Sequence, residues 1–353
     1  MNSASSVVKN RRKHIRKMEN CSHNITNKRN EKQSNKSNSC KLLSYDELPD
    51  YMKDNEFILN YYRAEWSLKQ AFFSLFQWHN ETLNVWTHLL GFIVFVGLTV
   101  VNAAHVSEAV DLFGFFRTSP SGFGTNSSHD SGKFLMFQDM TKVANLKHIS
   151  QQSEAMEEAT RWPFYVYLSG SMFCLLSSSI CHLFCCHSDK LNTWFLQMDY
   201  TGITIMIITS FFPAMYYIFQ CQPVWQIVYL SGISIFGAFT IITLLSPGKC
   251  RAFRATLFVS MGLFGIIPAV HACILNWTNP RRNLTLAYEG GMALSYLIGT
   301  GFYVSRIPER WKPGWFDLVG HSHQIFHVFV VIGALTHYAA ALVFMEYRSQ
   351  VGC

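Results

Sequence analysis

Long apolar runs dominate the chain from about residue 83 onward. Each run is about long enough to cross a bilayer as a helix, which takes roughly 20 residues. Short segments with charged residues separate most of them. The runs cover residues 83–102, 163–186, 200–219, 224–245, 253–275, 286–304 and 323–345. This pattern predicts an all-α integral membrane protein, a bundle of seven transmembrane helices, and argues against a soluble helical protein with a large core.

The first and sixth runs carry the weakest signal. The first has Asn84, Thr87 and His88 in its opening turns, and the sixth contains four glycines. Glycine is common in membrane helices because it allows a neighbouring helix to approach closely. We therefore keep both runs in the predicted bundle.

The chain before the first run has two parts. Residues 1–44 are basic and rich in Lys, Asn and Ser, and we expect them to form a disordered cytosolic tail. Residues 45–82 mix acidic, aromatic and aliphatic residues, with apolar side chains at helical spacing. This spacing fits an amphipathic juxtamembrane helix on the inner membrane face, and equally an ordinary soluble helix packed on the loops. The apolar side chains are Leu68, Phe72, Leu75 and Phe76.

The basic residues favour a cytosolic N-terminus and an outer C-terminus. Fourteen of the 29 Lys and Arg residues precede residue 83. In this orientation the short cytosolic loops hold seven basic residues and the short outer segments hold three, in agreement with the positive-inside rule. The long loop 103–162, which is partly rich in Ser and Gly, and the short tail 346–353 then lie outside. The topology is opposite to that of G-protein-coupled receptors.

Composition supports the membrane interpretation. Only 14% of the residues are charged and 49% are hydrophobic, whereas a soluble domain carries about a quarter charged residues. The net charge of +7 follows from the topology, so we expect no nucleic-acid partner. Cys181, Cys185 and Cys186 are interpreted as small apolar residues of a membrane helix rather than metal ligands. Cys221 and Cys353 would both lie outside, and the sequence leaves open whether they pair.

Three histidines and one aspartate fall at the same end of three predicted helices. His182 is near the inner end of the second helix, and Asp199 stands at the inner start of the third, 17 residues later. His323 and His327 lie in the first turns of the seventh helix. All four residues are therefore expected in the inner leaflet, where ionisable groups are costly and usually mark a functional site.

The spacing of these residues suits a zinc ion. His323 and His327 are four residues apart, so their imidazoles share one helix face. With His182 they provide three ligands, and a catalytic zinc typically takes three protein ligands and one water. Asp199 would then hold that water or accept its proton, and Ser178, one turn before His182, would donate a hydrogen bond. The alternatives are chance or packing for the histidine pair, a charge at a helix start for Asp199, and a backbone hydrogen bond for Ser178.

Other polar residues of the helices are assigned structural roles. Glu81, Asn84 and His88 share one face of the first helix; we expect Glu81 to hold the cytosolic loops and His88 to have its hydrogen bonds satisfied. His337 lies some four turns beyond His323, too far to join the same ion. No Lys or Arg neighbours the site along the sequence, so no competing cation is expected there.

Several long motifs carry a family resemblance over about residues 45–345. They are HNETLNVWTHLLGF at 79–92, SSSICH at 177–182, MDYTGI at 198–203, RIPERWKPGWFD at 306–317 and HSHQIFHVFVVIGALTHY at 321–338. In their order and spacing they resemble the progestin and adipoQ receptor family. The segment 42–66 is especially similar to the plant heptahelical transmembrane proteins, the adiponectin-receptor-like branch.

The resemblance implies seven helices with a cytosolic N-terminus and a zinc ion in the inner leaflet. The family's zinc ligands fall on His182, His323 and His327, its aspartate on Asp199 and its serine on Ser178. Its site is similar to that of alkaline ceramidases, which implies hydrolysis of a ceramide-like amide as one activity. The loop 103–162 departs from the animal receptors, which puts a protein hormone in doubt as a ligand. The plant branch is associated with hormone and stress responses.

Three functions follow as hypotheses for a multi-pass protein of the plasma membrane or an endomembrane. The first is a signalling receptor whose zinc site senses or processes a lipid or lipid-like molecule, with the N-terminal tail binding a cytosolic signalling protein. The second is a zinc-dependent amidohydrolase of the ceramidase type. The third is a structural zinc that clamps helices while the tail recruits partners.

Overall fold

A computed structural model describes residues 41–103, 161–246, 248 and 250–351. Most of the predicted tail 1–44 and of the predicted loop 103–162 lies outside the described residues, as does Cys353. Cys221 is disulfide-bonded. Within the described ranges the structure is helical, apart from one isolated bridge between Leu43 and Tyr62.

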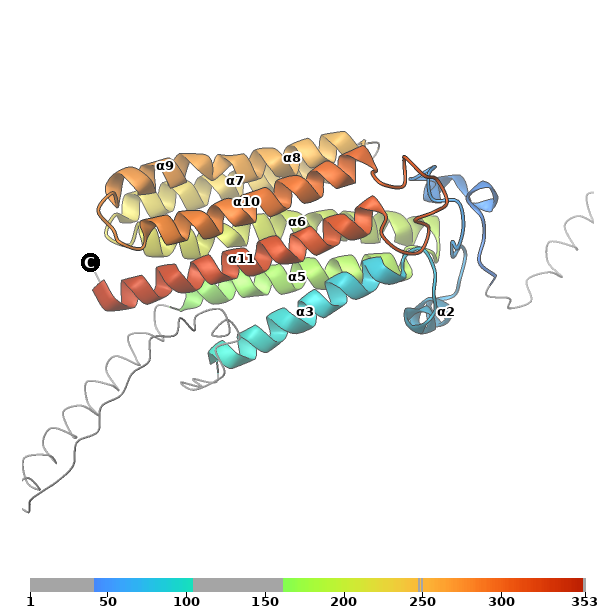
Figure 1. The fold of residues 1–353 in the computed structure, drawn as a ribbon, viewed down its shortest axis with the longest axis horizontal. Helices are drawn as coiled ribbons and strands as arrows, with labels where there is room; N and C mark the ends of the chain where they lie inside the picture. The colour runs from blue at the N-terminus through green and yellow to red at the C-terminus, as the bar shows by residue number, and fades with distance from the viewer. Residues whose placement is uncertain (1–40, 104–160, 247, 249, 352–353) are drawn as a thin grey trace, which may run out of the picture. The chain divides into compact units, whose positions relative to one another are not determined.

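Long helices run side by side along the bundle (Figure 1). Six spans among the described residues are long and apolar enough to cross a membrane, and α8 with α9 counts as one of them. Helix α10 has comparable length but does not reach that apolarity, in line with the weak signal of the sixth run. The helices are α3 (Thr82–Ala103), α5 (Trp162–Phe184), α6 (Asp189–Ile218), α7 (Pro223–Leu245), α8 (Arg251–Phe264), α9 (Ile266–Leu275), α10 (Arg282–Ser305) and α11 (Ser322–Val351).

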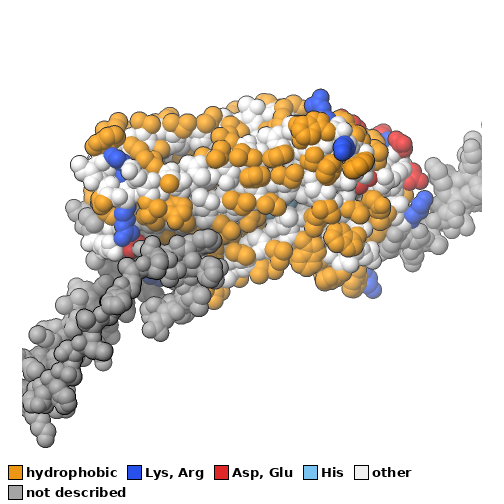
Figure 2. Space-filling model, viewed as in Figure 1, with side chains coloured by type: hydrophobic (Ala, Val, Ile, Leu, Met, Phe, Trp, Pro, Cys, Tyr) orange, Lys and Arg blue, Asp and Glu red, His pale blue; other side chains and the backbone are white. Residues whose placement is uncertain are grey.

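The bundle packs with α5, α6 and α11 at its centre. Helix α5 packs against α3 and α6, while α11 packs against α3, α6 and α10. Large apolar side chains remain exposed on the outer helices, for example Val224, Ile235 and Ile242 of α7, and Figure 2 shows apolar side chains over much of one face. A soluble protein rarely exposes so much continuous apolar surface. The fold is an integral membrane helix bundle, as predicted.

Two helix boundaries correct the sequence-based prediction. Helix α6 begins at Asp189, so Asp199 lies ten residues inside the helix and not at its start. Hydropathy detects only the apolar part of a helix, whereas residues 189–199 are mixed in polarity. The dipole explanation for Asp199 is therefore wrong, because that effect is confined to the first turn. Helix α11 continues to Val351, through most of the predicted tail 346–353.

Proline accounts for the interruption between α8 and α9. Pro268 has no backbone N–H, and its ring clashes with the carbonyl of the residue four positions earlier. That residue is Phe264, where α8 ends. The two short helices together cover the predicted run 253–275.

Residues 42–81 form a folded segment at one end of the bundle. It contains η1 (Tyr45–Glu47), η2 (Asp50–Met52), α2 (Leu68–Phe73) and η3 (Ser74–Phe76). The side chains of Ser67 and Gln70 form a capping box that begins α2. Leu68, Phe72 and Phe76 are exposed, so a soluble helix that packs its apolar face on the loops is not observed. A helix on the membrane surface stays a prediction.

Candidate metal centre

The three predicted histidines meet at the end of the bundle that carries residues 42–81. His182 comes from the last turn of α5, while His323 and His327 come from the first turns of α11. One ring nitrogen from each lies within 4.8 Å of the other two. The Nε2 atoms of His182 and His323 are 3.2 Å apart. His182 and His327 are buried, and His323 is partly buried.

Glu81 orients the ring of His182. Its Oε2 lies 2.8 Å from His182 Nδ1, and the Asn84 side chain donates a hydrogen bond of 2.6 Å to the same oxygen. Burial acts against the charged form of Glu81, but the imidazole of His182 and these hydrogen bonds outweigh it, and the pKa of Glu81 is lowered. An ionised carboxylate on Nδ1 directs Nε2 toward the other two histidines.

A backbone carbonyl orients the ring of His327 in the same way. Its Nδ1 lies 3.1 Å from the carbonyl oxygen of Asn84 and 3.2 Å from the hydroxyl of Thr87. Donation from Nδ1 to the carbonyl leaves Nε2 available as a ligand atom. Glu81, directly before α3, and residues of the first turns of α3 therefore fix one histidine from each of two other helices.

The donor set fits zinc. A tetrahedral ion with Zn–N distances of about 2.0–2.1 Å places its nitrogen ligands roughly 3.3 Å from one another. The separation of 3.2 Å between the Nε2 atoms of His182 and His323 is close to that value. Three neutral imidazoles with outer carboxylate and carbonyl partners are a common zinc environment.

Ser178 and Asp199 stand beside the histidines, and both side chains are buried. Asp199 is also near enough to His182 for their charges to interact. The five residues singled out from the sequence thus belong to one region.

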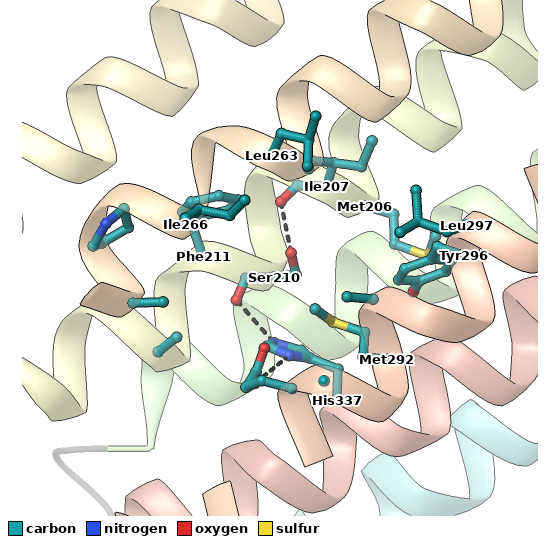
Figure 3. Close-up of a pocket in the computed structure, with 18 of the residues that line it drawn as sticks. Met206, Ile207, Ser210, Phe211, Leu263, Ile266, Met292, Tyr296, Leu297 and His337 are labelled. Atoms are coloured by element: carbon teal, nitrogen blue, oxygen red, sulfur yellow. Dashed lines mark hydrogen bonds and ion pairs between the residues drawn. The ribbon is translucent and has the colours of Figure 1, made fainter. Parts of the chain in front are cut away.

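A cavity of about 590 Å³ opens beside this region and continues along the bundle. Its lining includes Ser178, Asp199, His323 and His327 at one end. Most of the remaining lining is apolar, from α6, α8, α9, α10 and α11, and Figure 3 shows some of these residues. Ligand sites are commonly cavities of about 300–1,000 Å³ with few polar groups.

The family model described as "Haemolysin-III related" matches residues 76–338, most of the chain. The chain belongs to the haemolysin-III-related family. The resemblance to the progestin and adipoQ receptors, and among them to the plant heptahelical proteins, is thereby confirmed.

Curated relatives of this haemolysin-III-related chain include plant and animal proteins. "Heptahelical transmembrane protein 1" of Arabidopsis thaliana is 58% identical over 316 residues, covering 88% of this chain and 83% of the relative. "Heptahelical transmembrane protein 3" of the same plant is 47% identical over 318 residues, with coverages of 89% and 90%. The "Adiponectin receptor protein" of Drosophila melanogaster is 33% identical over 316 residues, with coverages of 88% and 61%.

The sequence did not reveal the part that α3 plays in the centre of this haemolysin-III-related chain. Glu81 contacts His182, whereas the prediction assigned Glu81 to the loops. His88 stacks on His327, with ring centroids 3.6 Å apart, and lines the cavity. Among the described residues neither ring nitrogen of His88 has a hydrogen-bond partner, so its predicted satisfied role is wrong. The sequence signal that could have revealed these contacts is the helix face that Glu81, Asn84 and His88 share.

Two arginines of α8 also approach the centre, contrary to the expectation that none would. The Arg251 guanidinium lies 4.7 Å from the centroid of the Tyr303 ring, and Arg254 donates a hydrogen bond to the Tyr303 hydroxyl. Tyr303 in turn packs against His323, with ring centroids 5.7 Å apart. The sequence did not indicate that these arginines approach the centre, because α8 comes next to the site only when the chain folds.

Buried polar contacts hold the ends of the two histidine-bearing helices. Arg63 is 1% exposed and donates hydrogen bonds to the carbonyl oxygens of His182 (2.7 Å) and Leu183 (3.0 Å), at the end of α5. Glu309 is fully buried and accepts a 2.7 Å hydrogen bond from the backbone N–H of Ser322, where α11 begins. These contacts satisfy backbone groups that a helix terminus leaves unpaired.

Proposed function

We propose that this protein is a receptor-like membrane protein whose three histidines bind Zn²⁺ in the inner leaflet, where the site senses or processes a lipid. The proposal depends above all on one arrangement. His323 and His327 line the same cavity as Ser178 and Asp199, so two of the three proposed ligands and a carboxylate face one space. A purely structural zinc needs no such opening.

The chemistry of the lining groups suits hydrolysis of an amide. A bound zinc ion would supply a Lewis acid and lower the pKa of a water molecule. Asp199 lines the cavity together with Ser178, and there its carboxylate would accept a proton. Glu81 and the Asn84 carbonyl keep the imidazoles in the tautomer that presents Nε2.

The cavity favours a lipid over a polar ligand. Apolar side chains such as Met206, Leu263 and Leu297 line most of its length, and they would leave the polar groups of a sugar or peptide without partners. A long-chain amide of the ceramide type places its polar end at the histidines and its chain among these side chains.

A role in signalling is supported by the relatives. A Drosophila relative is named an adiponectin receptor. For this chain we propose a hormone or stress response, with a cytosolic N-terminal tail that binds a signalling protein. The orientation rests on the distribution of basic residues.

Ceramide turnover by the purified protein tests the enzymatic part of the proposal. Wild-type protein should contain one zinc per chain and release fatty acid. His327→Ala should lose both, while Asp199→Asn should keep zinc and lose turnover. If the protein contains zinc but turns over no long-chain amide, lipid processing is contradicted and lipid sensing remains. If the protein contains no zinc, the metal centre itself is contradicted.

A further inference from the structure

A second polar cluster lies inside the bundle, away from the three histidines. His337 of α11 is 2% exposed. Its Nδ1 is 2.9 Å from Oε1 of Glu289 on α10, and its Nε2 is 2.9 Å from the carbonyl oxygen of Ser210 on α6. Figure 3 shows His337 pointing toward Ser210. The ring of Tyr167 packs edge-on against the ring of His337, with ring centroids 4.8 Å apart.

This cluster lines the cavity that also reaches the candidate metal centre. Glu289, Ser210 and His337 are all part of its lining, together with His327. His337 follows His327 by ten residues on one helix, a separation of about 15 Å along the axis. Within the cavity the cluster is therefore well separated from the histidine centre. Other polar side chains, among them Asn276, Arg281 and Arg348, also line the cavity.

The carboxylate of Glu289 has hydrogen-bonding capacity to spare. Its side chain is 29% exposed, and only Oε1 faces His337, at ion-pair distance but without the alignment of a hydrogen bond. Within the described part of the chain no hydrogen bond to the Glu289 side chain is found. A carboxylate beside an apolar cavity is costly unless a donor reaches it, and ionisable groups at membrane depth usually mark functional sites.

We propose that Glu289 and His337 form a second recognition point, which accepts a hydrogen bond from a hydroxyl group in the middle of a lipid chain. The ligand class is then a long-chain amphiphile with its polar end at the histidine centre and a hydroxyl farther along its chain. This inference rests on the proposed function, because that function places the polar end at the histidines. A purely structural ion pair between α10 and α11 is the competing explanation.

Binding of matched lipids to the full-length protein distinguishes the two explanations. The probes are a saturated long-chain N-acyl amine and its isomers with one hydroxyl near the polar end, at mid-chain or near the methyl end. A hydrogen bond to a charged acceptor should make the mid-chain isomer bind about tenfold more tightly than the other isomers. Glu289→Leu should remove this preference without weakening binding of the unsubstituted chain.

Two control variants separate recognition from loss of fold. Thr285→Val lies one turn earlier on α10 and also faces the cavity, but the Thr285 hydroxyl already donates to the carbonyl of Arg282. It should keep the preference for the mid-chain isomer. Glu289→Gln keeps an acceptor of the same size and should retain part of that preference. If the ion pair is purely structural, both Glu289 variants should lose stability, and the relative affinities for the isomers should not change.

The outcomes also separate this inference from the proposed function. Equal Kd values for all isomers in wild-type protein, or a preference that survives in Glu289→Leu, would overturn the second recognition point alone. If no member of the series binds although the protein contains zinc, both the recognition point and the lipid ligand are contradicted. Turnover of an unsubstituted amide without any isomer preference would support the proposed function and overturn this inference.

Discussion

Replacement of Glu81 by glutamine tests how α3 supports the metal centre. The carboxylate lies 2.8 Å from His182 Nδ1 and is partly buried. Because the pKa of Glu81 is lowered, the residue is ionised at neutral pH, and glutamine removes a full negative charge while keeping the size. The neutral amide also favours the tautomer that presents Nε2 less strongly, because its oxygen is a weaker acceptor for Nδ1–H than a carboxylate.

The expected loss follows from the position of Glu81 behind a ligand. Replacing an outer partner of a metal-binding histidine typically costs about 10–100-fold in metal affinity. We expect Glu81→Gln to weaken zinc binding within that range, which corresponds to about 1.4–2.8 kcal/mol. Competition with a chelator of known affinity, applied to purified protein in detergent, measures this change directly.

Glu289→Gln is a matched control for this substitution. Glu289 is also a glutamate 2.9 Å from the Nδ1 atom of a histidine on α11, but this histidine is His337. It lies about 15 Å along the helix from His327, so the control should leave zinc affinity unchanged. If Glu81→Gln also leaves zinc affinity unchanged, the reasoning about the outer partner is refuted.

Three further substitutions and one control test the surrounding structure. Arg63→Met should lower the apparent Tm and the stability by about 2–4 kcal/mol, because carbonyls at the end of α5 lose a charged donor. Gly170→Ala should lower the stability by about 1–3 kcal/mol, since a methyl group there would lie 2.8 Å from Thr209 Cβ. Its control, Gly97→Ala, has open space around it and should not lower the stability. Equal Tm values for these two variants would contradict the packing argument. Burial, together with the nearby positive charge of an arginine, lowers the pKa of His79 to about 3. The unfolded chain therefore binds the extra proton first, and stability should be full above pH ~6.5 and fall by about 1.4 kcal/mol per pH unit below it; His79→Asn should flatten that slope in pH-dependent unfolding, and an unchanged slope would contradict the assignment.

Apolar run length was enough to predict the bundle and the meeting of the three histidines. Because runs of helical length alternate in direction, His182 and the pair at 323 and 327 had to fall at the same end. Helical spacing placed His323 and His327 on one face. The structure confirms that the three histidine side chains meet.

The contacts made by α3 and α8 were not predictable from the sequence in the same way. Glu81 and His182 are 101 residues apart, and hydropathy carries no information on which helices are neighbours. The start of α6 was also missed, because its first turns are mixed in polarity. The unpartnered ring of His88 depends on close packing against His327, which no spacing rule indicates.

The central claim is that His182, His323 and His327 hold one zinc ion with an open position toward the cavity. The zinc X-ray absorption spectrum of the purified protein tests this most directly. The account predicts three imidazole nitrogens at about 2.0–2.1 Å and one further light atom, with the histidine signal lost in His327→Ala. A shell of sulfur ligands at about 2.3 Å, as Cys181, Cys185 and Cys186 would give, or a chain without zinc, would contradict it.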